Sequence, residues 1–397
     1  MPPAKSKQKP KKPYPDFPLF PHATGQWAKK IRGKLYYFGT DPDAALAKYL
    51  DEKDDRQAGR TPRQKADELT VRDLANHFLT SKQRVLDSGE LSPQTWRNYY
   101  DACEKVVTFF GTERLVIDLA SDDFERLRAD YAKTRGANAL ATVVQRVRTI
   151  FRFANDTDLI DRPVRFGPQF RKPSRKALRQ ARQAAGSRMI EAKDLRRILD
   201  AAKQPLKAMM LLGLNCAFGQ TDVANLPVAA IDFKTGWVDF PRPKTAIPRR
   251  IPLWAETEAA LREAIAKHRP APKSEADAGL VFVTHQGNRW VRTRHRENGG
   301  CVPVDSVNLE FTKLLEELGL KRHGLGFYAL RHVHRTIADT AKDLPAADAI
   351  MGHAPDAGDM PSVYPERLDD DRLRAVVNVV RAWLWPKSAV AAKVGRK

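Results

Sequence analysis

The chain has 397 residues, 42% of them hydrophobic, and this length predicts two or three domains rather than one core. With 69 Lys and Arg against 48 Asp and Glu, the net charge is +21, so nucleic acid is the expected partner; the alternative is a soluble protein that is merely basic. Three widely spaced cysteines exclude a disulfide scaffold and a thiolate zinc site and favour a reducing cytoplasm, and no apolar run reaches the ~18 residues of a membrane span.

The N-terminal region predicts a basic arm followed by a small folded unit. Residues 1–13 carry lysines without a following apolar run, which indicates a disordered arm rather than a secretory signal. Residues 14–60 predict two short strands that turn at Arg32-Gly33, then a helix that Asp41 caps and Pro42 begins. The hairpin has three candidate DNA contacts, with a solvated face as the alternative: Lys29, Lys30 and Arg32.

Residues 69–165 predict a domain of about four helices. Ser92-Pro93 begins the second helix and Gly111 ends it. The last helix, at about 137–155, has one apolar face and one basic face. The basic face would meet either phosphates or solvent, and its candidate DNA contacts are Arg146, Arg148 and Arg152.

Two polar segments predict linkers. Residues 54–68 separate the small unit from the helical domain. Residues 171–187 hold many cations and no acid, so they predict either a strap across a phosphate backbone or an ordinary solvated linker. The candidate DNA contacts of this basic segment are Arg171, Lys172, Arg175 and Lys176.

Residues 188–390 predict a second large domain. An apolar helix at 206–215 should lie in its core, and two strands are expected at 237–240 and 250–253 around a turn. A further short strand is expected at 280–283. The whole chain is therefore predicted to be mainly α with small β-sheets (α+β).

Several residues of this domain are suited to acid–base, nucleophilic or phosphate-binding chemistry. They are Asp222, Lys244 in the turn between the two strands, Leu330-Arg331-His332, and Gly352-His353 followed by Tyr364. Arginine grips phosphate oxygens bidentately, and tyrosine can serve as a covalent nucleophile. The combination is typical of chemistry on a phosphodiester.

This order resembles the tyrosine recombinases, or phage-type integrases, over most of the chain. By this resemblance 69–165 corresponds to their core-binding domain, 14–60 to their small N-terminal DNA-binding domain, and 188–390 to their catalytic domain. The resemblance implies a recombinase that cuts and rejoins double-stranded DNA, needs no metal or cofactor, and assembles as a dimer to tetramer. The last helix, 372–384, would then pack on a neighbouring subunit; packing within its own chain is the alternative.

The resemblance also implies a role for each residue of the motif. Tyr364 would attack the scissile phosphate and leave a 3′-phosphotyrosyl enzyme, while Arg331 would clamp the non-bridging oxygens. Lys244 would protonate the 5′-oxygen. His353 would donate to the phosphate or orient the nucleophile, and His332 would help to position it.

Two positions depart from the family's pattern. Gly219 stands where the family has its first catalytic arginine, a loss expected to cost ~10³ in rate unless another cation reaches in. Tyr328 stands where a His is usual, and its phenol can still donate a hydrogen bond. The candidate replacements, also candidate DNA contacts, are Arg242, Arg249 and Arg250. A DNA-binding protein that has lost catalysis, which Gly219 favours, and an enzyme like the type IB topoisomerases remain alternatives.

Overall fold

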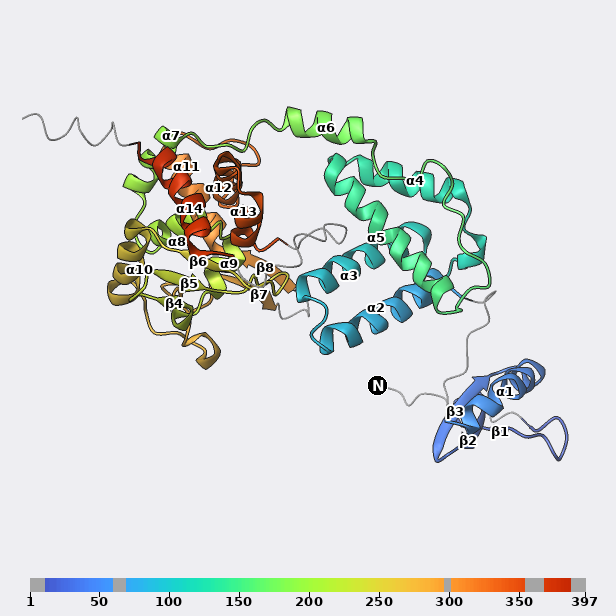
Figure 1. Cartoon of the computed structure of the whole chain (residues 1–397). Coiled ribbons are helices and arrows are strands. Elements are labelled where there is room, and N and C mark those ends of the chain that lie inside the picture. The colour runs from blue at the N-terminus through green and yellow to red at the C-terminus, as the bar shows by residue number, and fades with distance from the viewer. Residues whose placement is uncertain (1–10, 60–68, 296–300, 354–367, 387–397) are drawn as a thin grey trace, which may run out of the picture. The chain divides into compact units, whose positions relative to one another are not determined.

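The computed structural model describes residues 11–59, 69–295, 301–353 and 368–386, so Tyr364 lies outside the described residues. The chain divides into two compact units, Met1–Arg175 and Lys176–Lys397 (Figure 1). The first contains β1 (Phe20–Pro21), β2 (Trp27–Ile31), β3 (Lys34–Gly39), α1 (Pro42–Gln57), α2 (Val71–Asp87), α3 (Pro93–Phe110), α4 (Ser121–Ala132) and α5 (Ala137–Asp156), and α6 (Arg175–Ala184) spans the boundary. The second contains α7 (Ala192–Ala201), α8 (Leu206–Asn215), α9 (Gln220–Asn225), β4 (Ile231–Asp232), β5 (Trp237–Asp239), β6 (Arg250–Pro252), α10 (Ala255–Lys267), β7 (Val291–His295), β8 (Cys301–Asp305), α11 (Ser306–Glu317), α12 (Ala329–Ala338), α13 (Leu344–Met351) and α14 (Asp370–Leu384).

The small N-terminal sheet has its own core. Strands β2 and β3 pair antiparallel and turn at Arg32-Gly33, where both residues have positive φ, as the predicted hairpin requires. The short strand β1 adds a third strand that the sequence did not reveal. Helix α1 begins as predicted, because the Asp41 side chain accepts from the Ala44 amide. Trp27 and Tyr49 lie in the core between sheet and helix.

Helices α2 to α5 enclose a second core that is rich in phenylalanine. As predicted, Ser92 caps α3 and Gly111 ends it with a positive φ. The apolar face of α5 is buried, with Phe151 packed edge-on against Phe124. In the basic segment after this core, ten residues form the helix α6, which has no buried residue and which the sequence did not predict.

The C-terminal unit is built around α8, whose residues from Ala208 onward are all buried. Strands β4, β5 and β6 form an antiparallel sheet, which confirms the predicted strand–turn–strand. The strand expected at 280–283 is wrong: this apolar segment forms only an isolated bridge between Leu280 and Pro227 and is buried as irregular chain. The hairpin of β7 and β8 was not predicted. The fold is mainly α with small antiparallel sheets, as the sequence indicated.

Helix α14 packs on its own chain. Leu373, Val377 and Leu384 on its apolar face are buried in the C-terminal core. Trp254 donates its indole N–H to the Val377 carbonyl at 3.1 Å, and Arg196 donates to the Leu384 carbonyl at 2.6 Å. The helix therefore makes the contacts within its own chain that were one of the two arrangements left open.

Candidate active site

The guanidinium of Arg331 joins two distant segments of the C-terminal unit. Because Leu330 and Val333 anchor α12 in the core, Arg331 is only 1% exposed. Its Nη1 donates to the Ala217 carbonyl at 2.5 Å, and its Nη2 donates to the Met351 carbonyl at 2.6 Å. Burial lowers the pKa of Arg331, but a guanidinium still carries its proton near neutral pH. A fixed positive charge therefore lies between the end of α8 and the end of α13.

His353 lies beside this guanidinium. Gly352 ends α13 in the left-handed region, with φ 60°, and turns the chain so that His353 faces back to α12. Its Nε2 lies 3.4 Å from Arg331 Nη2, and its Nδ1 lies 3.2 Å from Asp348 Oδ1. Because a guanidinium only donates, Nε2 must accept, and the ring proton is on Nδ1. Burial lowers the pKa of His353, with Asp348 opposing, so the neutral ring is favoured.

The loop between β5 and β6 is fastened to the same turn. Arg242 Nη1 donates to the Gly352 carbonyl at 3.2 Å, and the Thr245 hydroxyl donates to that carbonyl at 3.4 Å. Lys244 lies between these two residues and is exposed. The structure therefore brings the predicted Lys244 loop to the predicted Arg331–His353 pair, although the three come from distant parts of the sequence.

Arg249 forms a buried ion pair at the other end of this loop. Its side chain is 0% exposed and its Nη2 donates to Asp222 Oδ1 at 2.8 Å. The second oxygen of Asp222 accepts from the Gly219 amide at 2.7 Å, at the start of α9. The guanidinium carbon stands 4.4 Å from the centre of the Phe218 ring and 5.6 Å from that of Phe240.

The remaining sequence candidates on this unit differ in their surroundings. Tyr328 is 41% exposed, and a Cβ added at Gly219 would lie 3.2 Å from its ring. His332 is exposed on α12 and packs edge-on against Tyr328, with centroids 5.2 Å apart. Burial lowers the pKa of His332, and the charges of Arg188 and Arg331 act in the same direction.

Arg250 lies apart from this cluster. It bonds Asp239 at 2.9 Å and Asp370 at 3.2 Å and covers the Trp237 ring at 4.2 Å. These contacts join β6 to β5 and α14, so the Arg250 side chain stabilises the packing of these elements.

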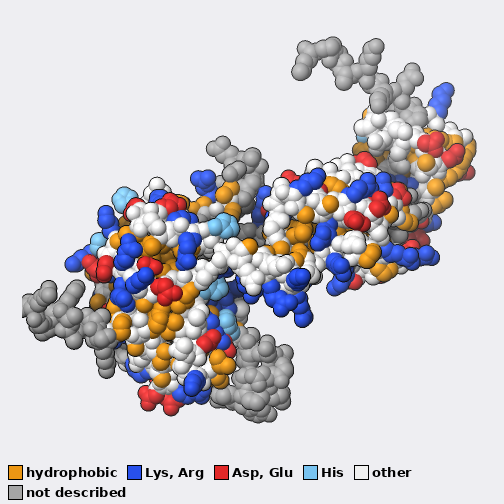
Figure 2. All heavy atoms as spheres, turned by 90° about the horizontal axis from the view of Figure 1, so that it is seen from above, with side chains coloured by type: hydrophobic (Ala, Val, Ile, Leu, Met, Phe, Trp, Pro, Cys, Tyr) orange, Lys and Arg blue, Asp and Glu red, His pale blue; other side chains and the backbone are white. Residues whose placement is uncertain are grey.

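Two candidates of the first unit are likewise occupied within the protein. Lys29 donates to the Pro18 carbonyl at 2.7 Å. Arg148 donates to the Phe170 carbonyl at 2.6 Å and lies 4.7 Å over the Phe166 ring. Arg146 is half-buried, and the other candidates are exposed: Lys30, Arg32, Arg152, Arg171, Lys172, Arg175 and Lys176. Figure 2 shows Lys and Arg side chains over much of the visible surface.

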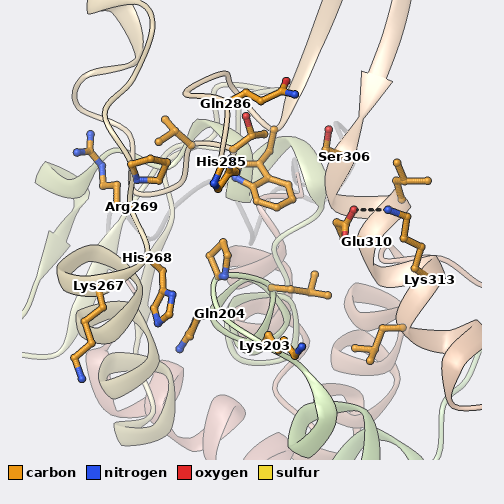
Figure 3. A pocket seen from close by; sticks show the side chains of 18 of the residues that line it. Lys203, Gln204, Lys267, His268, Arg269, His285, Gln286, Ser306, Glu310 and Lys313 are labelled. Atoms are coloured by element: carbon orange, nitrogen blue, oxygen red, sulfur yellow. Dashed lines mark hydrogen bonds and ion pairs between the residues drawn. The ribbon is translucent and has the colours of Figure 1, made fainter.

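A separate pocket of about 920 Å³ opens in the C-terminal unit (Figure 3). Polar side chains such as His268, His285 and Gln286 line it, and Glu310 pairs with Lys313 at one wall. None of the residues that line it belongs to the cluster around Arg331.

Three contacts of the cluster were not anticipated from the sequence: the carbonyls of Ala217 and Met351 and the carboxylate of Asp348. Only Asp348 left a local signal, since it precedes the Gly-His turn by one helical turn on α13. Among the described residues, no group of three His, Cys, Asp or Glu side chains is arranged to hold a metal ion. In the same ranges, no helix combines the length and apolarity needed to cross a membrane.

The chain is similar to known integrases in fold. No curated protein matches the chain by sequence. The fold is similar to a lambda integrase tetramer bound to a Holliday junction, at 15% identity and a TM-score of 0.52, covering 87% of this chain and 98% of that one. It is also similar to the Tn1549 transposon integrase bound to transposon right end DNA, at 14% identity and a TM-score of 0.55, covering 78% and 99%. Such identities show the fold alone.

Residues 188–359, which include the whole cluster around Arg331, match the sequence model of the phage integrase family. Over this segment the chain is similar to the phage integrase family, also called the tyrosine recombinases.

Proposed function

We propose that this protein cuts and rejoins double-stranded DNA at specific sites through a 3′-phosphotyrosyl intermediate on Tyr364. The observation that carries the proposal is the convergence of Arg331, His353 and the loop of Lys244 on the turn at Gly352. A buried cation, a neutral imidazole and an exposed ammonium are groups that a phosphoryl transfer without metal can use. The match of residues 188–359 to the phage integrase family supports the same reaction.

Each group has a defined task in the reaction. The phenol oxygen of Tyr364 bonds to the scissile phosphorus as the bond from phosphorus to the 5′-oxygen breaks. Arg331 stabilises the charge on the non-bridging oxygens, and Lys244 gives a proton to the departing 5′-oxygen. His353 Nε2, the acceptor of the neutral ring, exchanges its 3.4 Å contact with Arg331 for the phenol and takes the phenol proton. Attack of a new 5′-hydroxyl on the phosphotyrosine reverses these steps and joins the strand without ATP.

Other residues support DNA binding in this proposal. The exposed phenol of Tyr328 donates to the phosphate, and His332 positions that ring. Exposed cations of the first unit and of α6 contact the DNA backbone. The similar lambda integrase structures are a dimer on a core site and a tetramer on a Holliday junction, and we extend such assembly on DNA to this chain. The activity belongs in the cytoplasm, where the free, buried thiols of Cys103 and Cys216 stay reduced.

A nicked substrate tests the proposal, because loss of the short fragment after the nick traps the covalent adduct. The wild-type chain should form an SDS-resistant protein–DNA adduct, and Tyr364→Phe should form none while it binds DNA as the wild type does. Tyr14→Phe, at a tyrosine that is 46% exposed in the first unit, is the matched control and should react normally. An adduct with the Phe variant at position 364 would exclude that residue as the nucleophile.

Gly219 favours a second candidate, a DNA-binding protein that has lost catalysis. The wild-type chain would then protect a specific site in a footprint yet yield no adduct on the nicked substrate. Relaxation of supercoiled plasmid without dependence on a site would instead indicate an enzyme like the type IB topoisomerases.

A further inference from the structure

The position of Gly219 leaves little room for a larger side chain. A Cβ added there would lie 3.2 Å from the Tyr328 ring and 3.3 Å from Asp222 Oδ2. Both neighbours would have to give way before an arginine could extend from this position. If the site has a second arginine, that arginine must therefore come from another position in the chain than Gly219.

The Arg249 guanidinium already occupies the neighbouring space. It stacks on Phe218, the residue before Gly219, and its Nη2 bonds the carboxylate that also accepts from the Gly219 amide. The carboxylate of Asp222 thus contacts both the Gly219 amide and the Arg249 guanidinium. Arg249 also donates its Nε to the Phe240 carbonyl at 3.0 Å, so the guanidinium is held on two sides.

Arg249 meets the other cations of the site at Gly352. A Cβ at Gly352 would lie 2.9 Å from Arg249 Cδ and 3.1 Å from Arg242 Cδ. Arg331 donates to the carbonyl of the preceding residue, and Arg242 donates to the carbonyl of Gly352 itself. Three guanidinium-bearing side chains therefore surround one turn. Asp222 pairs with one of them, Arg249, whereas the nearby carboxylate of Asp348 pairs with Arg335 and His353.

Two of these cations have buried nitrogen atoms that find no acceptor within the described residues. They are Nη1 of Arg249 and Nε of Arg331. Buried N–H groups are almost always hydrogen-bonded, and a surplus of buried positive charge calls for an anion. A phosphate group, which has several acceptor oxygens and a negative charge, satisfies both needs.

From these contacts we infer that Arg249 serves as the second guanidinium of the phosphate site in place of the arginine absent at Gly219, and that Asp222 holds it there. The inference rests on the proposed function. Arg331 acts from α12 and Arg249 from the β5–β6 loop, so both share the charge that builds on the scissile phosphate. Asp222 is a positioning residue, because its two oxygens accept from Arg249 and from the Gly219 amide.

The test compares Arg249→Met with the wild-type full chain on two nicked substrates. One has the natural scissile phosphate, and the other has a methylphosphonate there, which lacks the negative charge. On the natural substrate the rate of adduct formation should fall about 10³-fold, the order found when an arginine finger is removed. On the uncharged substrate the two proteins should differ by less than about 10-fold, because there is little charge left to stabilise. A merely structural role would lower both rates equally.

Matched variants complete the test. Arg250→Met removes the adjacent arginine, which lies outside the cluster, and should leave the rate near that of the wild type. If Arg249→Met does not fold, because Asp222 is left unpaired, the double variant Asp222→Asn/Arg249→Met replaces it. Arg249→Lys restores the charge and should recover part of the rate.

The outcomes separate the inference from the proposed function. An Arg249→Met variant that reacts like the wild type, or one that loses equal activity on both substrates, overturns the inference alone. The same holds if Arg242→Met shows the charge-dependent loss and Arg249→Met does not. If the wild-type chain forms no adduct, the proposed function fails and Arg249 has no reaction to serve.

Discussion

The ion pair between Asp222 and Arg249 makes a prediction about stability that follows from its geometry. Asp222 uses both oxygens, one for Arg249 Nη2 at 2.8 Å and one for the Gly219 amide at 2.7 Å. In Asp222→Asn only one oxygen remains, so one of these N–H donors must face an amide NH₂ group. The two side chains are 0% and 11% exposed, and water therefore cannot replace the lost charge.

The expected cost follows from the burial of the pair. Removing one partner of a buried ion pair costs about 3–5 kcal/mol, and we expect a value near 3 because the remaining oxygen still accepts one bond. The double variant Asp222→Asn/Arg249→Met should cost less than the sum of the two single variants, with a coupling energy of about 1–3 kcal/mol. The reason is that the second change removes the charge which the first left uncompensated.

Urea unfolding of the full chain, followed by tryptophan fluorescence, measures this cost. Five of the seven tryptophans lie at or after Trp237, so the signal reports mainly on the C-terminal unit. Glu258→Gln is the control, because it breaks a pair with Arg262 whose side chains are 28% and 55% exposed, and it should cost no more than ~0.5 kcal/mol. The reasoning is refuted if Asp222→Asn costs no more than this control, or if the two single costs simply add.

Three further predictions concern other parts of the chain. His334 is buried with its Nδ1 on the Leu214 carbonyl, and burial lowers its pKa from 6.5 to about 4, so the folded state favours the neutral ring. The stability that the neutral His334 ring contributes is therefore complete above pH 6.5 and is lost as the pH falls toward 4, by up to roughly 3 kcal/mol in the free energy of unfolding measured with urea. His334→Asn should flatten this dependence of stability on pH, and an unchanged dependence would contradict the assignment. In α6, replacing the exposed Arg179 and Arg182 by Gln should lower the slope of log K against log salt in DNA binding by ~0.9 each, whereas an unchanged slope means that this helix does not contact DNA. Lys342 is exposed with φ 59°, so Lys342→Gly should raise the free energy of unfolding by about 1 kcal/mol, and Lys342→Ala should not.

Elements with strong local signals were predictable from the sequence. Ser92 and Gly111 mark the ends of α3 because a serine oxygen and a positive-φ glycine satisfy the free backbone groups of a helix in any fold. The turn at Arg32-Gly33 and the wholly apolar α8 are local in the same sense. The residue order Arg331, His353 and Tyr364 was also visible without coordinates, because family motifs are linear.

Elements that depend on distant partners were not predictable. The apolar segment 280–283 has strand composition, but its surroundings offer only one bridge to Pro227, so it is buried without a strand. Strand β7 is polar and charged and is a strand only because β8 pairs with it. Helix α6 has no buried residue, so its sequence has no apolar face from which a helix could be predicted.

The site itself shows the same division. The sequence determined which cations the chain has, and it named Arg242, Arg249 and Arg250 without a means to rank them. Tertiary structure ranked them, since Arg250 bonds Asp239 and Asp370 while Arg249 is buried against Asp222. The partners stand far apart in the chain, and burial and pairing with such partners, rather than residue type, decide which charge can act on a phosphate.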